Sequence, residues 1–142
     1  MKQQSGETWF RTSAQPRPHA CRRNDRRVRT CTQARDFARQ RLAEIRPADE
    51  NRTDDLLLVV SELATNAQRH AGGIIDFRLD VARDSATVSV TDASSDVPSC
   101  RRNEELTPGG FGWPIVLRLS REVTVSVHPG GKTILAVVSL AA

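Results

Sequence analysis

The feature that most constrains the fold is a change in the period of the apolar residues at Gly72-Gly73. Before the two glycines, the apolar run Leu56–Val60 continues into Ser61–Ala71, which has the pattern of a helix. After them, Ile75–Val81 alternates apolar and charged residues, as in a strand with one buried face. A glycine pair suits the end of a helix, because glycine easily adopts the left-handed conformation common there. The chain is therefore expected to place a long helix directly before a sheet.

Two polar residues stand out on the predicted helix. Glu62 and Asn66 are four residues apart and share one helix face, directly after a run that must be largely buried. We interpret the pair as part of a nucleotide site, with Asn66 as a magnesium ligand and Glu62 as the group that orders or deprotonates a nucleophile. The alternative is that both residues cap the helix or line a helix interface.

An earlier helix is predicted over about residues 32–45. Thr30 and Gln33 form a capping-box pattern, and apolar residues then recur at helical spacing until Arg46-Pro47 ends the element. Thr53 is the expected N-cap of the long helix, since two aspartates follow it near the positive end of the helix dipole.

The strand after the glycines is expected to form a hairpin. Asp84-Ser85 turns the chain, and the next strand buries alternate residues from Ala86 to Val90. Counting on by two places Asp92 on the apolar face at the end of that strand. An inward carboxylate needs a partner, because an unpaired buried charge is heavily penalised.

The residues after Asp92 are predicted to form one loop, one short helix and two strands. Residues 93–111 show no period, and a loop of this length is usually functional or disordered. Pro114 suits the first turn of a helix, residues 123–127 alternate as a strand, and the β-prone run 133–140 should lie centrally in the sheet. The predicted fold class is an α/β (α+β) two-layer sandwich, in which helices cover one face of a mixed, mostly antiparallel sheet.

Composition and charge divide the chain into two parts. With 142 residues and 38% hydrophobic residues, the chain has room for one core. Residues 1–41 carry a net charge of +8 and the rest −4. We expect a basic, arginine-rich, partly disordered arm over residues 1–29, with a short edge strand near Thr8–Arg11, and a folded domain over residues 30–142. Because no recognised DNA-reading motif accompanies the arm, a solvated arm is favoured over direct nucleic-acid binding.

The cysteines and the apolar runs indicate the compartment. Cys21, Cys31 and Cys100 are odd in number and lack metal-binding spacing, so we expect reduced thiols. No apolar run reaches the roughly 20 residues of a membrane span, and no signal-peptide pattern opens the chain. These observations predict a cytoplasmic protein without membrane contact.

The candidate residues together suit ATP. An aspartate at a pocket floor can accept a hydrogen bond from the adenine amino group, and glycines before a helix N-terminus let the backbone approach phosphates. One side-chain carbonyl plus phosphate oxygens can hold magnesium. Asp92, the Gly110-Phe111-Gly112 segment and Asn66 would supply these parts, and no Walker loop competes with them.

In order and spacing, these motifs resemble the Bergerat-fold (GHKL) ATPases and kinases, and within them the bacterial anti-sigma-factor serine/threonine kinases of the actinobacterial type. Ser61–Ala71 matches the family's N box, SEL-x-TNA-x-RHA. Gly110–Trp113 is similar to its second glycine box, and Gly130–Thr133 to its closing GGKT. The resemblance covers about residues 30–140. Two departures are that Asp92–Asp96 contains no glycine where D-x-G-x-G is common, and that Phe111 replaces a common arginine.

The resemblance implies a role for six residues. The implied roles are catalysis for Glu62, magnesium binding for Asn66, adenine binding for Asp92, phosphate contact for Gly110 and Gly112, and a position near the adenine for Thr133.

The implied function is an ATP-binding anti-sigma regulatory factor that uses ATP and Mg²⁺ to phosphorylate an anti-anti-sigma protein. Its implied partners are that antagonist and a sigma factor, and the sequence leaves open whether the chain forms a homodimer. The alternative is an ATP-dependent partner-binding module with negligible phosphoryl transfer. A detached histidine-kinase catalytic domain is disfavoured, because residues 1–29 show no phosphoacceptor helix pair.

Overall fold

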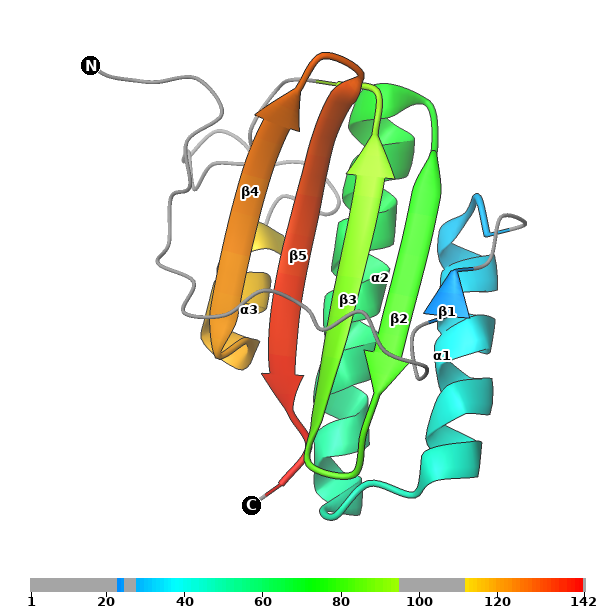
Figure 1. Ribbon diagram of the computed structural model, residues 1–142, viewed down its shortest axis with the longest axis vertical. Coiled ribbons are helices and arrows are strands. Elements are labelled where there is room, and N and C mark those ends of the chain that lie inside the picture. Colours follow the sequence, from blue (N-terminus) through cyan, green and yellow to red (C-terminus); the bar gives the residue numbers. More distant parts are fainter. Residues whose placement is uncertain (1–22, 25–27, 95–111, 142) are drawn as a thin grey trace.

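The sheet and the helices form two layers in the computed structural model, which describes residues 23–24, 28–94 and 112–141 (Figure 1). The five strands have the order β1-β2-β3-β5-β4, and every pairing among them is antiparallel. The strands are β1 (Arg23–Asn24), β2 (Asp76–Val81), β3 (Ser85–Asp92), β4 (Glu122–His128) and β5 (Gly131–Ser139). The predicted fold class is confirmed, and β5 lies between two strands as expected.

All three α-helices cover the same face of this sheet (Figure 1). They are α1 (Cys31–Ile45), α2 (Thr53–Ala71) and α3 (Gly112–Leu119), and a short 3-10 helix, η1 (Glu50–Arg52), leads into α2. The capping box before α1 is confirmed: the Thr30 side chain accepts a hydrogen bond from the Gln33 backbone, and the Gln33 side chain reaches back to the Thr30 backbone N–H.

The start of α2 corrects one prediction. Thr53 is the first helical residue and not the N-cap, because η1 runs directly into α2 and leaves Thr53 in the helical conformation. Its hydroxyl donates to the Glu50 carbonyl oxygen instead of accepting a backbone N–H. The predicted end of α2 is confirmed, since Gly72 adopts the left-handed conformation with φ 77°.

The core lies between the helices and the inward face of the sheet. Alternate residues of β3, namely Ala86, Val88 and Val90, are buried as predicted. Just before β2 the prediction failed at one position: Ile75, which was expected on the buried face, is 51% exposed, whereas Ile74 is buried. The alternation holds within β2, where Phe77, Leu79 and Val81 are buried.

Several predictions concern parts of the chain outside the described residues. They include most of the arm, the strand expected near Thr8–Arg11, Cys21, Cys100 and nearly all of the 93–111 loop. Cys31 is a free, half-buried thiol. Within the described ranges, no helix is long and apolar enough to cross a membrane.

Candidate functional site

Glu62 and Gly112 are brought into direct contact. A Cβ atom added to Gly112 would lie 2.0 Å from Oε1 of Glu62, closer than any real contact allows. The Glu62 side chain therefore packs against the backbone where α3 begins, in space that only glycine leaves open. The sequence pattern assigned both residues to the site, and the structure supplies a reason for a glycine at this position.

Partial burial changes the acidity of Glu62. Loss of solvent around the carboxylate raises its pKa, because burial penalises the charged form. A carboxylate with a raised pKa binds a proton more strongly and is a better proton acceptor once ionised. The half-buried position of Glu62 therefore suits a general base.

Asn66 lies one helical turn beyond Glu62 on α2 and is half-buried. A carboxamide oxygen is a hard ligand of the kind that magnesium prefers. The described residues contain no cluster of three or more His, Cys, Asp or Glu side chains that could hold a metal by themselves. The donor set thus fits an ion held by one protein oxygen together with phosphate oxygens and water.

Asp92 is buried at the end of β3 with 1% of its surface exposed, as the alternation of the strand predicted. The partner that this charge requires is Lys132, whose Nζ lies 3.0 Å from each carboxylate oxygen. The backbone N–H of Ser94 also donates to Oδ1 at 2.9 Å. The buried carboxylate is therefore both charge-neutralised and hydrogen-bonded.

The sequence-based reasoning missed Lys132, which is 0% exposed. A signal for it was present, because Ile134, Ala136 and Val138 are the buried residues of β5 and counting back by two reaches position 132. The register confirms this placement, since Lys132 lies directly opposite Asp92 on the neighbouring strand.

Gly131 fixes the turn that carries Lys132. Its backbone has φ 140°, and an added Cβ would lie 1.9 Å from the Asp92 carbonyl oxygen. The turn between β4 and β5 therefore packs directly against the chain that leaves β3. This contact brings the GGKT motif to the predicted adenine residue.

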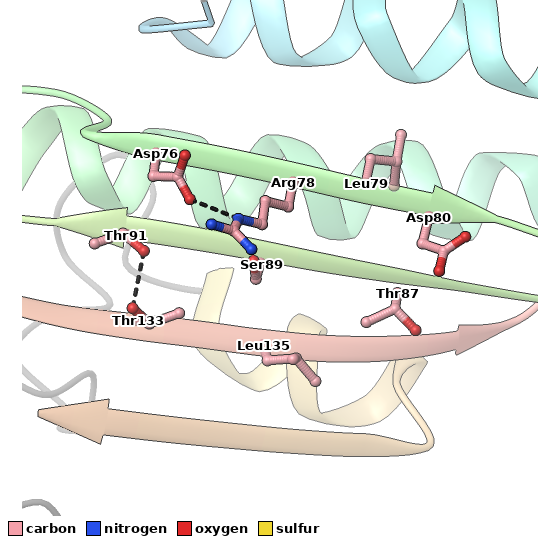
Figure 2. Close-up of a pocket in the computed structure, with 9 residues that line it drawn as sticks. All are labelled: Asp76, Arg78, Leu79, Asp80, Thr87, Ser89, Thr91, Thr133 and Leu135. Carbon is pink, nitrogen blue, oxygen red and sulfur yellow. Dashed lines mark hydrogen bonds and ion pairs between the residues drawn. The ribbon is translucent and has the colours of Figure 1, made fainter. Parts of the chain in front are cut away.

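Thr133 lies on the other face of the sheet, away from the helices (Figure 2). Its hydroxyl is 2.8 Å from Oγ1 of Thr91 and 3.0 Å from Nε2 of His128. The structure therefore does not bring Thr133 together with Asp92, because successive side chains of a strand point to opposite faces. The inward position of the motif belongs to Lys132. Gly110 and Phe111 lie outside the described residues.

The elements that carry the remaining site residues meet at one end of the molecule. The C-terminal half of α2, the end of β3 and the start of β5 lie at the same end of the two layers (Figure 1). These elements carry the half-buried Glu62 carboxylate, the half-buried Asn66 carboxamide and the buried Asp92 carboxylate. Such a set can bind a polar ring, order a phosphate-bound cation and accept a proton.

Comparison with known families agrees with this geometry. A family model described as the histidine kinase-like ATPase domain matches residues 25–138, which is most of the chain. No curated protein matches the chain.

Proposed function

The chain belongs to the histidine kinase-like ATPase domain family, and on this premise we propose that it is an ATP-binding anti-sigma regulatory factor with serine/threonine kinase activity toward an anti-anti-sigma protein. ATP binding is what the family supports. The observation that carries the kinase proposal is the half-buried Glu62, with its raised pKa, held against the first residue of α3.

In this proposal the adenine ring of ATP binds against Asp92. An ionised carboxylate offers about four acceptor positions. Lys132 and the Ser94 N–H use three of them in the structure. The remaining position can accept the adenine amino group, whereas the carbonyl of guanine would offer no proton there. The buried Asp92 would therefore favour adenine over guanine.

Asn66 is the proposed magnesium ligand, through its side-chain oxygen. When bound, the ion would neutralise charge on the ATP phosphates, which is the main requirement of phosphoryl transfer. Glu62, one turn away, stays available for the protein substrate because its position against Gly112 fixes the carboxylate.

The proposed transfer uses Glu62 as the proton acceptor. The hydroxyl oxygen of a serine or threonine on the antagonist attacks the γ-phosphorus, and the bond from that phosphorus to the bridging oxygen breaks to leave ADP. The hydroxyl proton passes to the Glu62 carboxylate. Phosphorylation would release the antagonist and leave this protein free to hold a sigma factor.

A second function is favoured by one observation. Lys132 already holds the Asp92 carboxylate, so the position of this carboxylate is set by the protein itself. Such a site suits an ATP-dependent binding module, in which the nucleotide fixes a partner surface and phosphoryl transfer is negligible.

Phosphorylation of the antagonist separates the two functions. Co-purification from the native cell would identify the antagonist, which is then incubated with purified protein, magnesium and γ-labelled ATP. The kinase proposal predicts labelled phosphoserine or phosphothreonine that disappears with Glu62→Ala. Labelling no greater than in this control, with ATP still bound, would establish the binding module instead.

A further inference from the structure

A hollow of about 410 Å³ lies on the face of the sheet opposite the helices (Figure 2). It crosses β2, β3 and β5. Its lining is charged on β2, carries hydroxyl side chains on β3, and consists of Thr133 and Leu135 on β5. Its lining includes Asp76, Arg78, Leu79, Asp80, Thr87 and Leu135. Among the described elements, no helix covers this face (Figure 1).

The hollow has an unbalanced negative charge at its β2 side. Asp76 forms an ion pair with Arg78, with Nε 2.9 Å from Oδ2. Asp80, two residues further along the strand, has no ion pair within the described part of the chain. A ligand that fits here should bring a cation for Asp80 and an apolar group for Leu135.

The arm of this chain begins at the border of the hollow. β1 pairs with β2 so that Arg23 lies opposite Leu79 and Asn24 opposite Arg78. Both β2 partners line the hollow. The chain that precedes β1 therefore begins beside the hollow.

The length and chemistry of the arm fit the hollow. Residues 1–22 contain four Lys or Arg residues and one acidic residue, a net charge of +3, and include the sequence Trp9-Phe10-Arg11. Twelve extended residues, the separation of Arg11 from β1, span up to about 40 Å. The distance from β1 across to β5 is three strand spacings, roughly 15 Å, so Arg11 and its aromatic neighbours can reach any part of the hollow.

We propose that the Trp9–Arg11 segment docks in this hollow within the same chain, with Arg11 at Asp80 and the aromatic pair against Leu135. The proposal is independent of the proposed kinase function, because it uses the sheet face opposite Glu62 and Asn66. It gives the basic arm a binding site on its own domain.

Tryptophan fluorescence of the full chain tests the docking. The protein has two tryptophans and no tyrosine, so Trp113→Phe leaves Trp9 as the sole tryptophan. We expect blue-shifted emission and weak quenching by acrylamide relative to a peptide with the sequence of residues 1–22. Thr87→Arg, added to the Trp113→Phe protein, fills the hollow and repels the arm. The emission wavelength of Trp9 and its quenching by acrylamide should then equal those of the peptide.

The control is Ser139→Arg, which adds the same side chain to the same sheet face outside the lining of the hollow. It should leave the Trp9 signal unchanged, and circular dichroism verifies that each variant is folded. Trp9 emission equal to that of the peptide in the parent, or shielding that survives Thr87→Arg, would overturn the proposal. Shielding that weakens on dilution would also overturn it, because the occupant would then be a second copy.

Discussion

At the scale of single residues, the site combines two carboxylates whose surroundings differ. Glu62 is half-buried, has a raised pKa and contacts the backbone of Gly112. Asp92 is fully buried but paired with Lys132. Burial makes the charged form of Glu62 less favourable, whereas the Asp92 carboxylate accepts hydrogen bonds from Lys132 and from the Ser94 N–H. The two roles proposed for these residues follow from that contrast.

Glu62→Gln should separate activity from stability. The amide keeps the shape of the side chain but cannot accept the substrate proton, so we expect antagonist phosphorylation to fall by about 10²–10⁴-fold. Because the folded-state pKa is raised, burial of ionised Glu62 costs stability, and this cost appears as the pH rises through the raised pKa. The variant should therefore have a melting temperature at pH 7 equal to or above that of the parent. A lower melting temperature would contradict the assignment.

The pH dependence of phosphorylation should follow the same group. Glu62 accepts a proton only when ionised, so the transfer rate should rise with pH through a pKa above the ordinary value for glutamate. The rate is measured at saturating ATP over mildly acidic to neutral pH. The residual activity of Glu62→Gln should not rise with pH in this range. The same rise in both proteins would show that a group other than Glu62 titrates.

The Asp92–Lys132 pair should show strong coupling in stability. Lys132→Met leaves a buried carboxylate without its cation, which typically costs about 3–5 kcal/mol of unfolding free energy. Replacing both partners, with Asp92→Leu and Lys132→Met, should recover most of that loss, because no buried charge remains. Urea unfolding of the parent, both single variants and the double variant measures the coupling. Additive losses in the double variant would show that the two residues do not act as a pair.

At the scale of elements, two glycines set how close the helices, strands and turns approach. Gly112 lets α3 begin against Glu62, and Gly131 lets the β4–β5 turn pack on the end of β3. At both positions a side chain would meet atoms of a site residue. The positions of Glu62 and Asp92 are thus determined by neighbouring elements as well as by their own helix and strand.

Gly112→Ala should displace Glu62 or the start of α3. The added methyl group would lie 2.0 Å from Oε1 of Glu62, so the carboxylate must move. We expect a large fall in antagonist phosphorylation, because the displaced carboxylate is the proposed proton acceptor, and a small fall in the melting temperature. Gly130→Ala is the matched control, since its nearest neighbour, Nδ1 of His128, is 3.9 Å away. Equal effects of the two substitutions would contradict the contact.

The N-terminus of α1 tests the capping box. Thr30→Ala removes the side-chain acceptor for the Gln33 N–H and should lower the unfolding free energy by about 1 kcal/mol. Thr32→Ala, an exposed substitution within the first turn of α1, is the control and should be neutral or slightly stabilising. The comparison uses urea unfolding of both variants.

At the scale of the whole molecule, local sequence patterns predicted most of the elements. The capping box, the glycines after α2 and the alternation of β3 were sufficient to predict the two layers and the inward Asp92. The errors have physical causes. Thr53 follows the 3-10 helix η1, which was not predicted, and Ile75 precedes the first residue of β2, so the alternation of the strand does not extend to it.

The face on which Thr133 lies could not be predicted from the motif. The motif match placed Thr133 near the adenine, whereas the alternation of β5 places Lys132 inward and Thr133 outward. Which residue of β5 lies opposite Asp92 depends on the pairing of β5 with β3, which joins distant parts of the chain. The shared helix face of Glu62 and Asn66 followed from helical spacing alone, but the contact of Glu62 with Gly112 depends on the packing of α2 against α3.

ATP binding by Asn66→Ala in the presence of magnesium shows whether this carboxamide holds the ion. Calorimetric titration with ATP and magnesium is compared for the parent, Asn66→Ala and Asn51→Ala, a matched control in which an exposed carboxamide is removed from η1. We expect the parent and Asn51→Ala to bind ATP and Asn66→Ala to lose magnesium-dependent binding, with all three proteins folded. Equal affinity of Asn66→Ala and the parent in the presence of magnesium would contradict this role of Asn66.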